Sequence, residues 1–197
     1  MDRSVTARAP IIISRDDRYF QDKYQGVPKD GYTKMFEKML DNENIEIKLN
    51  TDFKDVKNEI EYDFLFYTGP IDEFFGYKFD GLEYRCLKID FKTLNKESYQ
   101  PGSVVNYPDN RHKFTRITEF KKLTQQKHKK TTIGIEYPGG EGFVAWPFLD
   151  KKNQKIFQKY WKEAEKLKKK NIYFAGRLAE YKYYNMDKVV KNALDLF

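Results

Sequence analysis

The sequence contains very little cysteine and histidine for a chain of 197 residues, with one cysteine and two histidines. The single cysteine, Cys86, forms no intrachain disulfide, and no Cys/His cluster has the spacing of a zinc site. No apolar run approaches transmembrane length, and no signal peptide is visible. We therefore expect no metal site and no membrane span, and a protein of the reducing cytoplasm.

Positive charge and aromatic side chains are abundant instead. The formal net charge is +7, and 16 Phe and 15 Tyr bring the aromatic share to 17%. Positive charge suits an anionic partner such as nucleic acid, phosphate or a membrane surface. The lysine-rich runs at 121–130 and 162–170 are typical of solvated faces. Aromatic and basic residues do not interleave in a recognisable RNA-binding motif, so we expect no nucleic-acid partner.

Hydrophobic periodicity predicts helices over 32–40, 154–170 and 186–197. Four strand-like runs with turn residues between them predict an antiparallel sheet: "LEYRCLKIDF", "GSVVNYP", "KFTRITEF" and "TTIGIEYP". "IEIKLNTDF" alternates as a strand, and "GFVAWPFLDKKN" indicates a loop.

Two further segments are typical of an α/β domain. "NIYFAG" indicates a buried strand that needs parallel neighbours, and the chain supplies one plausible partner, "YDFLFYTGP". The closing stretch "GRLAEYKYYNMDKVVKNALDLF" continues that strand as a loop and a helix, an arrangement that aims backbone N–H groups at an anion. The first 30 residues have no capped start, which is typical of the middle of a larger protein. The fold class that we predict is α+β, with an antiparallel sheet beside an incomplete α/β domain.

Several long motifs resemble the UDP-galactopyranose mutase family, in order and over nearly the whole chain. They are "DDRYFQDKYQGVPKDGYTKMFEKML", "YTGPIDEFF", "LEYR", "VVNY", "FTRITEFK" and "GRLAEYKYYNMD". The resemblance implies a flavoenzyme that interconverts UDP-galactopyranose and UDP-galactofuranose through reduced FAD. It implies UDP-galactose and UDP as binding partners. Whether the protein forms a homo-oligomer stays open.

The resemblance covers only the C-terminal half of such an enzyme. The family begins with a dinucleotide-binding half that carries a Gly-x-Gly-x-x-Gly loop. This sequence has no such loop, and its glycine-rich "PGGEGF" is interpreted as a turn. We therefore expect a truncated mutase that does not retain FAD alone, with a separate N-terminal FAD-binding half as a partner. Whether the isolated chain is an enzyme stays uncertain.

The domain organisation that the resemblance implies has four parts. They are a mobile-loop and helical segment at 1–43, part of the FAD-binding domain at 44–72, the antiparallel substrate-binding sheet at 73–150, and a helix, strand and helix completing the FAD-binding domain at 151–197.

The resemblance also implies site residues, although no residue is assigned as catalytic. The substrate-binding set is Arg8, Tyr19, Asn106, Arg116, Trp146 and Tyr183. The cofactor-binding set is Arg177, Asn185 and Met186. Arginines suit a diphosphate because the planar guanidinium can bond two phosphate oxygens at once.

More ordinary roles remain open for two members of these sets. A cross-strand salt bridge with Glu119 or a neighbour is the alternative for Arg116. A backbone-satisfied amide in the sheet is the alternative for Asn106.

Two departures from the family pattern bear on activity. "AWP" places Ala145 and Trp146 where the family has two tyrosines, and "YYNMD" places Asn185 where it has an aspartate. Tryptophan donates only through its indole N–H, and asparagine removes a negative charge. A non-catalytic remnant that binds UDP-sugar or acts as a structural module is therefore the alternative function.

Overall fold

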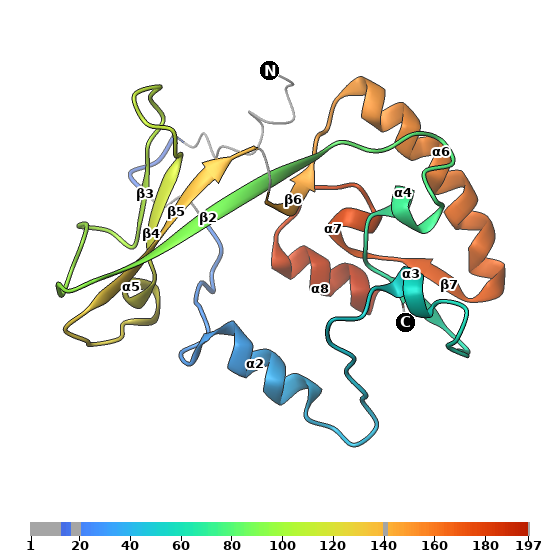
Figure 1. Ribbon diagram of the computed structural model, residues 1–197, viewed down its shortest axis with the longest axis horizontal. Coiled ribbons are helices and arrows are strands. Elements are labelled where there is room, and N and C mark those ends of the chain that lie inside the picture. Colours follow the sequence, from blue (N-terminus) through green and yellow to red (C-terminus); the bar gives the residue numbers. More distant parts are fainter. Residues whose placement is uncertain (1–12, 17–20, 140–141, 197) are drawn as a thin grey trace. The chain divides into compact units, whose positions relative to one another are not determined.

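The computed structural model describes residues 13–16, 21–139 and 142–196. The chain contains both helices and strands (Figure 1) and divides into two compact units. The first unit is Met1–Ile47 with Lys88–Pro138, and the second is Lys48–Leu87 with Gly139–Phe197. The mixed helix-and-sheet class with an antiparallel sheet is confirmed. None of the helices in the described ranges is long and apolar enough to cross a membrane.

Helix α2, Gly31–Leu40, begins the described secondary structure of the first unit and confirms the predicted helix. The strand predicted over 45–53 is wrong, because residues 45–52 form turns and irregular backbone and Phe53 begins a helix. Asn50 adopts a left-handed φ of 53°, and the Asp52 side chain accepts a hydrogen bond from the backbone N–H of Lys54 at 3.0 Å to cap the next helix. Alternation alone does not make a strand where no neighbouring strand pairs with the segment.

An antiparallel sheet organises the first unit. Its strands β3 (Val104–Asn106), β4 (Arg116–Glu119) and β5 (Thr131–Pro138) confirm three of the four predicted strands. β4 lies between the other two, with Arg116 paired to Asn106 on one side and to Glu136 on the other. The core of this unit gathers on one face, where Ile117 packs with two isoleucines of β5.

A short helix, α5 (Phe120–Thr124), follows β4 and packs on β5. Gly134 makes this close approach feasible, because a Cβ atom there would lie 2.9 Å from the Phe120 ring and 3.1 Å from Ile89. The phenyl rings of Phe91 and Phe120 lie 5.8 Å apart. A residue without a side chain is therefore required where β5 passes beneath α5.

Strand β2, Tyr84–Leu94, is the fourth predicted strand. The sheet order is β3-β4-β5-β2-β6 (Figure 1), where β6 is Phe143–Pro147. The loop predicted over 142–153 is therefore wrong in its first half. β6 pairs antiparallel with the beginning of β2, far away in sequence, so no local hairpin signal marks it.

A parallel pair of strands lies at the centre of the second unit. β1 (Leu65–Tyr67) pairs with β7 (Ile172–Phe174), which confirms the partner predicted for "NIYFAG". The Leu65 N–H donates to the Asn171 carbonyl at 2.9 Å, and the Ala175 N–H donates to the Tyr67 carbonyl at 3.1 Å. The other helices of the unit are α3 (Phe53–Val56), α4 (Ile71–Phe74), α6 (Lys151–Leu167), η1 (Lys168–Lys170), α7 (Gly176–Ala179) and α8 (Met186–Leu194).

Helix α6 supplies much of the core against which this pair packs. Ile156, Tyr160 and Ala164 are buried at spacings of four residues, so they share one helix face. The Asp150 side chain caps the helix by accepting a hydrogen bond from the Asn153 N–H at 2.7 Å. The predicted long helix is confirmed, and it begins slightly earlier than its apolar pattern indicates.

Two fully buried tyrosines fix loops of the second unit through their hydroxyl groups. The Tyr160 hydroxyl donates to the Asp80 carbonyl at 2.7 Å and accepts from the Phe79 N–H at 2.9 Å. The Tyr181 hydroxyl lies 2.6 Å from the Glu83 carbonyl oxygen and 3.0 Å from that of Phe148. Burial raises the pKa of both phenols, so both hydroxyls stay protonated and able to donate.

Removing the Tyr181 hydroxyl should destabilise the second unit. We expect Tyr181→Phe to lower the free energy of unfolding by about 1–3 kcal/mol, because two backbone carbonyls lose their shared donor. Urea unfolding followed by tryptophan fluorescence measures this change. Tyr62→Phe, at a tyrosine that is 43% exposed, is the matched control and should change little. Equal stability of the two variants would show that the Tyr181 hydroxyl contributes nothing.

Candidate functional site

The predicted site residues divide between the two units. Asn106 and Arg116 belong to the first, whereas Trp146, Arg177, Tyr183, Asn185 and Met186 belong to the second. Arg8 and Tyr19 lie outside the described residues. The predicted site residues that the structure describes therefore form one group in each unit.

Arg116 and Asn106 face each other across adjacent strands of the first unit. The Arg116 Nε–H donates to the Asn106 side-chain oxygen at 3.0 Å. The Arg116 Nη1 atom lies 3.6 Å from a carboxylate oxygen of Glu136, the cross-strand partner on β5. The salt-bridge alternative for Arg116 is thus present, and its partner is Glu136.

These contacts leave the guanidinium available to a ligand. The Arg116 side chain is 46% exposed, whereas that of Glu136 is only 16% exposed. Asn106 takes up the Nε–H, and an arginine carries four further N–H donors on its two terminal nitrogens. Although Glu136 lies beside Nη1, the half-exposed guanidinium has terminal N–H groups that are suited to contact with a phosphate. The Asn106 side chain accepts a hydrogen bond from another side chain, so it contributes to the orientation of the Arg116 guanidinium.

In the second unit, Tyr183 contacts two other predicted site residues, Trp146 and Arg177. The Trp146 and Tyr183 ring centroids lie 5.9 Å apart with an interplanar angle of 85°, which is an edge-to-face arrangement. The Arg177 guanidinium carbon lies 4.3 Å from the Tyr183 ring centroid, within cation–π range. Tyr183 therefore contacts one member of the predicted substrate-binding set and one member of the predicted cofactor-binding set.

Arg177 carries an unusual polar atom. Its Nε atom is buried and has no hydrogen-bond partner among the residues that the structure describes. Buried donors are normally paired, so an orphaned guanidinium N–H points to an acceptor that comes from outside this set of residues. An anionic or oxygen-rich group such as the phosphates or the ring carbonyls of a flavin nucleotide fits this donor.

The turn that carries Arg177 is held by Glu180. Gly176 adopts a φ of 88°, which favours glycine, and its N–H donates to the Glu180 carboxylate at 3.1 Å. The Tyr184 hydroxyl also donates to this carboxylate. Burial, and then this hydrogen bond, raises the pKa of Tyr184, so its hydroxyl remains a donor at neutral pH.

Asn185 and Met186 mark the beginning of helix α8. Asn185 is the N-cap residue, but its side chain makes no capping hydrogen bond, and Met186 is 62% exposed. The Asn185 carbonyl accepts the N–H groups of Lys188 and Val189, each at 3.1 Å. The predicted helix is confirmed, whereas the cofactor role of its N-terminus stays a prediction.

Sequence reasoning missed Arg85. It lies opposite Trp146 in the β2–β6 pair, beside an irregularity in the register. Its guanidinium carbon lies 4.5 Å from the centroid of the Phe148 ring. Cross-strand partners share a face of the sheet, so a second arginine borders the Trp146 group. Arg85 is the last residue of "LEYR", one of the motifs that resemble the family.

The part of the chain that the structure describes contains no cluster of three or more His, Cys, Asp or Glu residues able to hold a metal ion. The candidate site residues in the described ranges have guanidinium, amide, aromatic and thioether side chains. The guanidinium and amide groups bind and orient anions, and these residues include no histidine.

Comparisons with known proteins agree over nearly the whole chain. The family model for UDP-galactopyranose mutase matches residues 1–183. A Klebsiella pneumoniae protein named "Probable UDP-galactopyranose mutase" is 36% identical over 195 residues, covering 97% of this chain and 50% of that protein. The dTDP-fucopyranose mutase of Escherichia coli is 33% identical over 201 residues, covering 98% of this chain and 53% of that protein.

Similar proportions hold for a third relative and for a solved structure. The UDP-galactopyranose mutase of Mycoplasma genitalium is 36% identical over 209 residues, covering 96% of this chain and 51% of that protein. A crystal structure of reduced UDP-galactopyranose mutase superposes with a TM-score of 0.54 at 15% identity, covering 70% of this chain and 42% of that one. The chain thus spans about half the length of the curated relatives it matches.

Replacing Tyr183 should loosen the group around Arg177. We expect Tyr183→Leu to lower the free energy of unfolding by about 0.5–2 kcal/mol, because the cation–π contact and the edge-to-face ring contact are both lost. Tyr183→Phe keeps the ring and should lose less. Urea unfolding of the two variants measures the difference, and a leucine variant as stable as the phenylalanine variant would contradict this role for the ring.

Proposed function

The chain belongs to the UDP-galactopyranose mutase family, and we propose that it forms the substrate-binding part of a flavin-dependent sugar mutase. The reaction would be the interconversion of UDP-galactopyranose and UDP-galactofuranose. The observation that carries the proposal is the half-exposed Arg116 guanidinium, oriented by Asn106 and paired with Glu136, within a chain that matches the family over residues 1–183.

Each group of residues has a distinct task in this proposal. Arg116 binds the substrate diphosphate through its terminal N–H groups, and Asn106 orients the guanidinium. Arg8 and Tyr19 belong to the proposed substrate set by resemblance alone. In the second unit Trp146 and Tyr183 would contact the substrate, while Arg177, Asn185 and Met186 would lie on the cofactor side.

The cofactor that the family implies is FAD, and the residues present fit it in one respect. The buried Arg177 Nε–H needs an acceptor, and a flavin nucleotide is rich in acceptor oxygens. Bound reduced flavin supplies the nucleophilic chemistry at the anomeric carbon in this family. The chain's own residues bind the diphosphate, orient the nucleotide and neutralise its charge.

Retention of the cofactor depends on a partner, which we propose to be an N-terminal FAD-binding half. The relatives are about twice as long as the matched region. The described residues of the second unit contain a parallel sheet of two strands only, whereas parallel sheets are normally larger and covered on both faces. The proposed half would extend this sheet.

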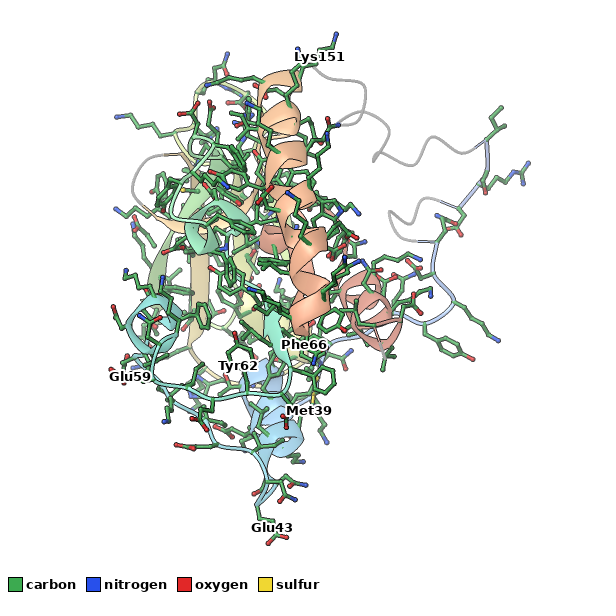
Figure 2. The ribbon with its side chains drawn as sticks, turned by 90° about the vertical axis from the view of Figure 1, so that its right-hand side faces the viewer. Met39, Glu43, Glu59, Tyr62, Phe66 and Lys151 are labelled. Carbon is green, nitrogen blue, oxygen red and sulfur yellow. The ribbon has the colours of Figure 1, made fainter. Side chains whose placement is uncertain are left out.

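Exposed apolar side chains of the second unit favour such a partner. Met186, Val190 and Leu194 follow one another at intervals of four residues on α8 and are 62%, 58% and 70% exposed. The segment entering β1 exposes Tyr62 and Phe64 as well, and Figure 2 labels Tyr62 and Phe66 along it. A row of apolar side chains on one helix face is typical of a protein–protein contact.

The four-part organisation at 1–43, 44–72, 73–150 and 151–197 is part of this proposal. The last and second parts would complete the FAD-binding domain, and the third would hold the substrate. The pairing of β1 with β7 supports the proposal, because it joins the second part to the fourth.

A second candidate function is a non-catalytic module that binds a nucleotide sugar. One observation favours it: Trp146 and Asn185 differ from the family pattern. A relative of comparable identity is named dTDP-fucopyranose mutase, so the choice of nucleotide is part of the same question. The substrate nucleotide is therefore tested with both UDP and dTDP.

Arg116 should dominate nucleotide binding. We expect Arg116→Ala to weaken UDP binding at least tenfold in calorimetry at low salt, because a charge-assisted hydrogen bond contributes about 1.5–3 kcal/mol. Arg111→Ala removes an exposed arginine of the same unit that pairs with Asp109, and it is the matched control. An Arg116 variant with unchanged affinity for both UDP and dTDP would remove Arg116 from the site.

The apolar row on α8 should govern assembly with the N-terminal half. The purified chain alone should carry less than stoichiometric flavin, measured by absorbance after heat release. It should acquire flavin and co-purify with the N-terminal half of a complete mutase when the two are co-expressed.

We expect Val190→Lys with Leu194→Lys to abolish this co-purification, because burying two lysines is unfavourable.

Lys188→Glu changes an exposed charge on the same helix and is the control for that experiment. It should leave assembly intact. Stoichiometric flavin in the chain alone, or assembly that survives the double substitution, would contradict the proposed interface.

A further inference from the structure

A fully buried carboxylate lies three residues beyond Arg116 on the same strand. Glu119 ends β4, and its side chain is 0% exposed. One carboxylate oxygen accepts the Tyr99 N–H at 3.0 Å and the Thr131 hydroxyl at 2.7 Å. The other oxygen accepts the Gln100 N–H at 3.1 Å. A buried charge therefore holds two consecutive backbone N–H groups of the segment that precedes β3.

Lys122 completes the charge balance of this site. Its Nζ atom lies 3.5 Å from the Glu119 carboxylate. The same ammonium group donates to the Gln100 carbonyl and, at 3.2 Å, to the Pro101 carbonyl. The acid and the base thus bind the N–H and C=O groups of one short stretch of backbone.

The Gln100 side chain extends the same attachment to the sheet. Its amide nitrogen donates to the Ile117 carbonyl at 3.1 Å and to the Ser103 carbonyl at 3.1 Å. The Glu119 N–H donates to the Ser103 carbonyl at 2.7 Å. Both ends of the segment 99–103 are therefore hydrogen-bonded to β4, and β3 begins immediately after this segment.

We propose that Glu119 is a positioning residue for Arg116, acting through residues 99–103. By holding this segment on β4, Glu119 sets the register of β3, so that Asn106 lies opposite Arg116 and its side-chain oxygen meets the Arg116 Nε–H. The part of this inference that concerns nucleotide binding rests on the proposed function; the part that concerns the Arg116 side chain does not.

The geometry explains why the residue carries a charge. Two backbone N–H groups and a hydroxyl converge on the two carboxylate oxygens, and only a carboxylate accepts at both. Burial acts to raise the pKa of Glu119, but the hydrogen bonds from Thr131, Gln100 and Tyr99 outweigh it and lower the pKa. The group is therefore ionised at neutral pH.

Glu119→Gln tests the inference, because it keeps the shape and replaces one acceptor oxygen by an NH₂ donor facing backbone N–H groups. The readout is the NMR signal of the Arg116 Nε–H, assigned by its loss in Arg116→Lys. We expect its exchange with water to accelerate at least tenfold, and UDP affinity to fall about tenfold. Glu97→Gln, an exposed residue just before the same segment, is the matched control and should change neither.

A merely structural role makes a different prediction. Loss of general stability would change the backbone amides of the β4–β5 pair, such as Thr118 and Gly134, to the same extent as the Arg116 side chain. The proposal expects those amides to stay protected while the Arg116 Nε–H exchanges faster. An unchanged Arg116 signal in folded Glu119→Gln, or equal changes throughout the sheet, would overturn it.

A second variant covers the case in which Glu119→Gln does not fold. Gln100→Ala removes the side-chain bonds to Ile117 and Ser103 but leaves the backbone N–H groups that bind Glu119. It should accelerate exchange of the Arg116 Nε–H in the same way, and an unchanged signal would overturn the proposal. Faster exchange in a chain whose unsubstituted form binds neither UDP nor dTDP would support the positioning role and reject the proposed function.

Discussion

The parallel pairing of β1 with β7 is the constraint on which the second unit depends. Parallel strands cannot be joined by a tight hairpin, so a long connection must run between them. Here that connection contains β2 to β6 and helix α6. The pairing closes the core around Tyr67 and Phe174, and it sets the place where the chain leaves β7 into the Gly176–Arg177 turn. Arg177 follows directly from this strand end, and its buried Nε has no partner among the residues that the structure describes.

The first unit depends in a similar way on the central position of β4. Arg116 begins the strand and is half exposed, whereas Glu119 ends it and is fully buried. The two charges therefore have opposite surroundings within a single strand. The exposed guanidinium is suited to a ligand, and the buried carboxylate is satisfied entirely by groups of its own unit. Two charged residues at opposite ends of β4 thus have different physical roles.

Local patterns predicted most of the elements, because helices and strands bury one face at a regular spacing. Helices α2, α6 and α8 and strands β1 to β5 and β7 all appear where the sequence indicates them. The short helices α3, α5 and α7 were not predicted, and α7 lies at the beginning of the loop predicted after β7. Two further errors lie where a local pattern is not decisive. Residues 45–53 alternate without a partner strand, and β6 has a partner but no hairpin signal. Pairing between distant segments decided both cases.

For the candidate site, the sequence alone predicts the family and the set of basic and aromatic residues, and these 197 residues contain no Gly-x-Gly-x-x-Gly loop. These features are carried by residue identity and order. The tertiary structure decided which residues meet. Arg116 pairs with Glu136 and Asn106, Arg85 lies opposite Trp146, and Glu119 holds the segment before β3. Such contacts follow from strand register, and a shift of one residue would turn each side chain to the other face of the sheet. Register is set by packing over the whole unit, so it cannot be predicted from any short stretch of the sequence.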